Sequence, residues 1–178
     1  MNYSEDKFKS LIHYVCASCE DVSQLGATKL NKILWYSDVI SYLKHGSPIT
    51  GETYLKRQFG PVPSRVMSAL NSLSDDKLIT VRRAEHFGYP KKEFISLKTP
   101  DVSEVFSSDE IELIDEVVHK ICNNYTATSI SDKTHDEIWE MAKIGESIPY
   151  EAVLVSQLGE VDEHDMSWAE DEAKDIAA

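Results

Sequence analysis

The chain of 178 residues lacks long apolar runs, since no stretch approaches the roughly 18 apolar residues that cross a bilayer. Its first ten residues, MNYSEDKFKS, have no apolar core of the kind found in a secretory signal peptide. Cysteine is scarce, and three residues are too few, and of the wrong parity, for a secreted disulfide framework. These absences predict a cytoplasmic protein that does not enter membranes.

The sequence also lacks the common chemical motifs, because it holds no glycine-rich phosphate loop, no nucleophile motif and no paired metal ligands. Cys16 and Cys19 form a single CxxC, whereas a closed zinc site needs a second pair of ligands. Both cysteines fall on the apolar stripe of an expected helix, which favours buried small side chains. We therefore expect no metal, no cofactor and no enzymatic activity.

One stretch, KTHDEIWEM, offers a candidate for catalysis. His135 and Trp139 lie four residues apart and would share a helix face. With Asp132, Asp136 and Glu137 nearby, His135 could act as a general base oriented by an acid. No nucleophile accompanies it, so we favour a structural role in which His135 stacks on Trp139.

Basic residues become scarce in the second half of the chain. Residues 1–100 hold 14 Lys and Arg against 10 Asp and Glu, whereas residues 101–178 hold 4 against 21. The acidic excess repels nucleic acid and anionic membranes and attracts a basic partner surface, although solubility alone could also explain it. We expect one domain over residues 1–155 and an acidic tail over residues 156–178.

Hydrophobic periodicity and turn residues predict an α+β fold that is mainly helical. The expected helices cover residues 4–20, 28–44, 64–76 and 107–122, with one or two shorter ones within 126–145. The expected strands cover residues 53–59, 78–83 and 91–97, and GPVP at 60–63 is expected to be a turn. The small sheet would be an antiparallel hairpin or have three strands.

This order of elements resembles that of a winged helix, which raises the alternative of a DNA-binding regulator. The hairpin carries Arg82, Arg83, Lys91 and Lys92, as a wing could. The third helix, however, offers only Arg65 to a DNA groove, and a reading helix usually brings several basic or amide side chains. Together with the acidic second half, this argues against a nucleic-acid partner.

The second expected helix begins with TKLNKILWYSD, in which two lysines stand among apolar residues. A helical projection places Leu30 and Tyr36 on the core face and Lys29 in the first turn, where its charged head could reach water. Trp35 and Tyr42 fall on the opposite side. Because aromatic residues on a polar face are favoured at interfaces, we expect a partner-binding surface, unless another part of the chain covers them. The expected partner-binding residues are Trp35, Tyr42, Asn31, Asp38 and Arg65.

Four stretches, taken in order, resemble the Panacea domain, the SocA-like antitoxin family: TKLNKILWYSDVISYLKHGSPITGETY, FGPVPSRV, the hairpin and SDKTHDEIWEMAKIGESIPYEAV. The resemblance spans residues 8–155. The matching positions are Lys29, Leu30, Tyr36, Asp38, Gly46, Ile49, Gly51, Gly60, Pro61, Val62, Thr134, His135, Trp139, Gly145 and Ile148. We expect these motif residues to serve the fold, with Gly60, Pro61 and Val62 fixing a turn that orients the third helix.

The resemblance implies an antitoxin that neutralises a partner toxin by direct protein–protein binding. Some members of the family instead deliver the toxin to a ClpXP-type protease as adaptors, and homologues occur in phages and prophages. No enzymatic activity is known for the family. The acidic half would suit a toxin with a basic active-site surface, and the terminal Ile176, Ala177 and Ala178 resemble a tag read by ClpX-type unfoldases.

Overall fold

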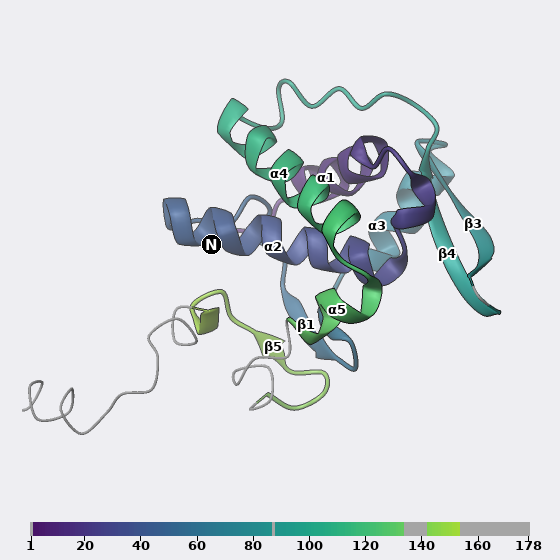
Figure 1. Cartoon of the computed structure of the whole chain (residues 1–178). Coiled ribbons are helices and arrows are strands. Elements are labelled where there is room, and N and C mark those ends of the chain that lie inside the picture. The colour runs from purple at the N-terminus through teal and green to yellow at the C-terminus, as the bar shows by residue number, and fades with distance from the viewer. Residues whose placement is uncertain (1, 87, 134–141, 154–178) are drawn as a thin grey trace, which may run out of the picture.

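The structure is a computed structural model that describes residues 2–86, 88–133 and 142–153 (Figure 1). Its helices are α1 (Glu5–Ser18), η1 (Val22–Gln24), α2 (Ala27–His45), α3 (Val66–Asp75), α4 (Ser108–Asn124) and α5 (Ala127–Asp132). Its strands are β1 (Tyr54–Arg57), β2 (Gly60–Pro63), β3 (Ile79–His86), β4 (Tyr89–Ser96) and β5 (Ser147–Ile148). The predicted mixture of helices and a small antiparallel sheet is confirmed, and none of the helices described could cross a membrane.

Side-chain caps fix the starts of two helices where the sequence predicted them. The Ser4 hydroxyl accepts a hydrogen bond from the backbone of Lys7 at the start of α1. Ser107 and Glu110 form a reciprocal capping box at the start of α4. The second helix starts one residue earlier than expected, after Gly26, which provides no side-chain cap.

The strands form two separate sheets rather than one. A three-stranded sheet has the order β2-β1-β5, and β3 pairs only with β4. The expected turn at residues 60–63 is wrong, because Gly60–Pro63 is strand β2, antiparallel to β1. Its prolines are tolerated because β2 lies at an edge of the sheet. The first four long helices and the hairpin follow in the predicted order, but β2 and β5 were not predicted as strands, and β1 pairs with both of them.

Helix α2 is the element around which the others pack. It contacts α1, α4, α5, β2 and β4, and Figure 1 shows it crossing the middle of the molecule with α4 and α1 on one side and β1 and β5 on the other. Ten of its residues are buried, and these include lysine, aspartate and serine as well as apolar side chains. The helix therefore has no wide polar face turned to solvent.

The loop between α2 and β1 turns sharply at two glycines, both in the left-handed region. Gly46 ends α2 with a φ of 72° and Gly51 follows with a φ of 69°. A Cβ on Gly46 would meet nothing within 4 Å, whereas a Cβ on Gly51 would lie 2.8 Å from the backbone oxygen of Asn2. The chain before α1 thus packs directly on Gly51.

We predict that Gly51→Ala lowers the free energy of unfolding by about 3 kcal/mol, since left-handed strain and a backbone clash add together. The matched control Gly46→Ala should lose only about 1 kcal/mol, because it has the strain without the clash. Urea titration of both variants measures the difference. Equal losses would show that the contact with Asn2 does not constrain the loop.

Candidate functional site

The expected partner-binding residues Trp35 and Asp38 lie inside the protein. Trp35 is 5% exposed and Asp38 is 0% exposed. The Trp35 ring packs edge-on against Tyr54, with centroids 4.9 Å apart, and is stacked with Tyr150 at 6.2 Å. The expectation that Trp35 stands on an open surface is therefore wrong, because a segment more than 100 residues further along the chain covers it.

Asp38 is the centre of a buried polar group that we call the Asp38 cluster, made of Asp38, Thr50, Tyr54 and Tyr150. The backbone N–H of Thr50 donates to Oδ1 at 2.7 Å, and its hydroxyl donates to Oδ2 at 2.6 Å. The Tyr54 hydroxyl donates to Oδ2 at 2.8 Å. The Tyr150 hydroxyl lies 3.5 Å from the same oxygen. One carboxylate thus ties the loop, β1 and the β5 segment to α2.

Burial raises the pKa of Asp38 to about 6, against the hydrogen bonds from Thr50 and Tyr54, which lower it. Burial also raises the pKa of the two tyrosine hydroxyls beside it. Both hydroxyls therefore remain protonated donors at neutral pH. The arrangement stabilises a carboxylate by donors and offers no nucleophile or general base to a substrate.

Glu52 is a second buried carboxylate, and it holds Arg65. Its Oε1 accepts from Ser64 at 2.7 Å and from Arg65 at 2.9 Å, and the Tyr3 ring lies 4.3 Å from the guanidinium carbon. The other oxygen of Glu52 is buried and has no hydrogen-bond partner within the described chain. Arg65 remains exposed, but an ion pair and an aromatic ring fix its position.

The other end of α2 shows what Lys29 does. The ammonium group is buried and donates to the Cys122 carbonyl at 2.9 Å and to Gln24 at 3.3 Å, so the expectation that it reaches water is wrong. The carbonyl belongs to the last turn of α4, where helical carbonyls lack partners within the helix. Lys29 therefore caps α4, and burial lowers its pKa. Burial also lowers the pKa of Lys32, in the next turn, to about 7.

The three cysteines are buried and free, as expected for small core side chains. The Sγ atoms of Cys19 and Cys122 lie 3.1 Å apart, and burial raises the pKa of Cys16 to about 12. Groups of three or more His, Cys, Asp or Glu that could hold a metal do not occur in the part of the chain that the structure describes.

Among the remaining predicted residues, the core contains Leu30, Ile49 and Ile148, and Tyr36 packs against it. Asn31 and Tyr42 are half-buried on α2, and the Tyr42 ring lies 5.8 Å from that of Tyr150. Gly145 donates its N–H to the Lys56 carbonyl and so leads into β5. Thr134, His135, Trp139 and the expected tail over residues 156–178 lie outside the described residues.

Sequence reasoning missed Thr50, Glu52, Tyr54 and Tyr150 as parts of this site. The run TGETY places three of them within five residues, between the expected helix over 28–44 and the expected strand over 53–59 and at the start of that strand. This alternation of hydroxyl and acid side chains was the available signal, but its partner Asp38 lies on another element.

A family model for the SocA-like antitoxin, Panacea domain, matches residues 30–140, which is more than half of the chain. The chain therefore belongs to the SocA-like Panacea-domain antitoxin family, as its sequence motifs predicted. The match begins inside α2, so α1 and β5 lie outside it. No curated protein and no solved structure is significantly similar to the chain.

We predict that Asp38→Ala lowers the free energy of unfolding by about 3 kcal/mol, because both donors of Thr50 lose their acceptor, whereas the Tyr54 hydroxyl keeps the Leu34 carbonyl. Asp38→Asn keeps an acceptor oxygen at the same place and should cost clearly less. Urea unfolding of the two variants tests this. A loss that is the same for both would mean that the shape and one acceptor oxygen are not enough, and that the second carboxylate oxygen or its charge is what matters.

The pH dependence of Asp38 has a definite sign. The pKa of Asp38 is raised from 3.8 to about 6. The stabilisation that Asp38 adds to the free energy of unfolding is therefore fully present below pH 3.8 and is lost as the pH rises through 6. The wild-type free energy of unfolding, measured relative to Asp38→Asn, should therefore be larger at pH 5 than at pH 7.5, changing by up to about 1.4 kcal/mol per pH unit. Since Lys32 titrates in both proteins, the difference isolates Asp38. A difference between the two proteins that stays constant or rises from pH 5 to pH 7.5 would contradict the raised pKa of Asp38.

Proposed function

We propose that this protein is an antitoxin that neutralises a partner toxin by direct binding and not by catalysis. Membership of the SocA-like Panacea-domain antitoxin family is the observation that carries the proposal. The Asp38 cluster supports it, because its ionisable groups are engaged in holding the fold together. The partner is the product of a toxin gene, and binding covers the toxin's active surface.

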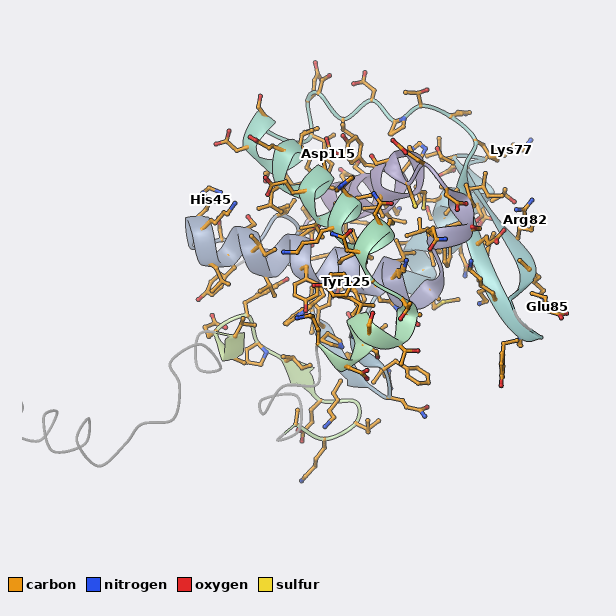
Figure 2. The ribbon with its side chains drawn as sticks, viewed as in Figure 1. His45, Lys77, Arg82, Glu85, Asp115 and Tyr125 are labelled. Carbon is orange, nitrogen blue, oxygen red and sulfur yellow. The ribbon has the colours of Figure 1, made fainter. Side chains whose placement is uncertain are left out.

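The outer face of α4 supports a partner with a basic surface. Four exposed acids, which we call the acidic face of α4, lie on this helix: Asp109, Glu112, Asp115 and Glu116. Figure 2 labels Asp115 on α4, where it is exposed and accepts a hydrogen bond from the Tyr14 hydroxyl of α1 at 2.9 Å. A shallow hollow lined by Phe106, Ile111, Glu112 and Glu116 adds apolar contact area. Charged rims of this kind raise association rates and select partners of opposite charge.

The first test is co-expression of the chain with the product of the adjacent reading frame. We expect the product of this reading frame to arrest growth when it is expressed alone. Co-expression with the chain should restore growth, and the two proteins should co-purify as a stable complex. Restored growth with a disappearing partner would instead support a protease adaptor. A frame that is not toxic and does not co-purify would contradict the antitoxin proposal for that partner.

We predict that Glu112→Lys combined with Glu116→Lys lowers the association rate with the toxin at least tenfold at low salt, because two attractive charges become repulsive. Surface plasmon resonance at several salt concentrations measures the rate. Asp75→Lys combined with Asp76→Lys, at the exposed end of α3, is the matched control and should change the rate much less. Equal effects in both variants would show that net charge matters and the acidic face of α4 does not.

A further inference from the structure

A cleft of about 850 Å³ lies where the start of α2, η1, the tip of the hairpin and the α4–α5 junction meet. We call it the basic cleft, because Arg83, Lys91 and Lys92 line it together with the rings of Tyr89 and Tyr125. No Asp or Glu is among its described lining residues. The surface of a chain with a net charge of −13 thus contains a cationic hollow, in which Lys91 donates to the Ser23 carbonyl and lies beside Glu93, whereas Arg83 and Lys92 form no ion pair with a described residue.

The cations of the basic cleft are only partly compensated. Arg83 and Lys92 lie directly opposite each other in the β3–β4 register, and neither forms an ion pair with a described residue. Like charges opposed across strands destabilise a hairpin. By contrast, the neighbouring Arg82 donates to Glu93 at 2.7 Å, and Lys91 lies 3.7 Å from the same residue. The opposed pair therefore costs stability unless an anion binds to it.

The start of α2 adds positive potential to the same place. Its N-cap, Gly26, makes no side-chain hydrogen bond, and its first turn holds no acid. The free N–H groups of a 19-residue helix carry a partial positive charge. Nearby, Tyr89 is 76% exposed, so the cleft offers an apolar ring beside its cations. Cations, helix dipole and aromatic rings together suit a ligand that is acidic and contains an aromatic group.

We propose that the basic cleft binds an acidic peptide, and that its occupant is the segment of this same chain at residues 160–175. This segment has seven more acids than basic residues, together with one aromatic residue, Trp168: its acids are Glu160, Asp162, Glu163, Asp165, Glu170, Asp171, Glu172 and Asp175, and its lysine is Lys174. The carboxylates match Arg83, Lys91 and Lys92 in charge. Trp168 suits the exposed Tyr89, since aromatic pairs add attraction beyond buried area.

The chain length allows this contact. The last described residues lie beside Tyr150, which packs on Tyr42 near the end of α2, whereas the cleft lies at Ala27. The 15 residues between Ala27 and Tyr42 correspond to about 22 Å of helix. Residues 154–160 alone can span roughly 23 Å when extended. Tethering also gives the segment an effective concentration in the millimolar range, which a free acidic ligand would have to exceed.

Bound in this way, the segment is withheld from other basic surfaces. A partner whose cationic surface is larger than the cleft displaces it, and the cleft then loses its anion. The inference does not depend on the identity of any toxin, because both binding surfaces belong to this chain. Its test therefore uses the isolated full-length protein, and its failure would leave the proposed function untouched.

The test is zero-length cross-linking of the full chain with a water-soluble carbodiimide, which joins a carboxylate to an amine as an amide. Peptide mass spectrometry should find links from Lys91 or Lys92 to the acids of residues 160–175. The yield should fall at least fivefold in about 0.5 M salt, where surface charges are screened. A link from Lys91 to its neighbour Glu93 is expected in any case. Links from these lysines to other acids throughout the chain, or a yield that ignores salt, would overturn the proposal.

Matched variants test whether the acidic segment binds in the basic cleft. Arg83→Glu combined with Lys92→Glu should reduce the remaining Lys91 links at least fivefold. Lys98→Glu combined with Lys120→Glu makes the same change in net charge at exposed sites outside the cleft and should leave them unchanged. Circular dichroism checks that both variants fold. In a mixture of ¹⁴N and ¹⁵N chains, links within one chain support the proposal, whereas links only between copies would overturn it.

Discussion

The burial of Asp38 in the central helix is the interaction on which the rest of the structure depends. An isolated buried carboxylate is costly, so this one must collect donors from whatever packs around it. Thr50 supplies two and Tyr54 a third, which fixes the loop and β1 against α2. The Leu34 carbonyl also lies 2.8 Å from the Tyr54 hydroxyl, whose one proton is shared between this carbonyl and Asp38, so the same ring is held at two points of the helix. Misplacing any of these elements would leave a charge without partners.

Further contacts depend on the position that Asp38 gives to Tyr54. Because Tyr54 is fixed, β1 presents its edge to β5, and Tyr54 pairs with Ile148. The Tyr150 hydroxyl then reaches the Glu52 carbonyl at 2.5 Å, and its ring is stacked with Trp35. Glu52 in turn holds Ser64 and Arg65 at the start of α3. A chain of contacts thus runs from one buried carboxylate to the far end of the described sequence.

Local features were predictable from the sequence, and long-range ones were not. The caps at Ser4 and Ser107, the stop at Gly46 and the hairpin all follow from residues a few positions apart. The faces of α2 did not follow, because a helix surrounded on all sides buries both faces and leaves no reliable periodicity. The role of Lys29 was equally hidden, since its acceptor at Cys122 lies 93 residues away. The strand at residues 60–63 was misjudged because Gly and Pro usually mark turns, and an edge strand is the exception.

The distribution of charge links the fold to the proposed function. Hydrogen bonds hold the buried Lys29 and Asp38 of α2, and the surface carries an acidic face on α4 and a basic cleft elsewhere. Both surfaces are positioned by the ends of α4, since its last turn is capped by Lys29 and leads into Tyr125 at the cleft. A cationic partner on the acidic face would therefore bind to α4, whereas an acidic segment in the cleft would bind beside the end of this helix. Because the two sites attract opposite charges, a basic toxin surface would compete with the cleft for the acidic segment while also binding α4, so release of the segment costs free energy that the contacts with the toxin must offset.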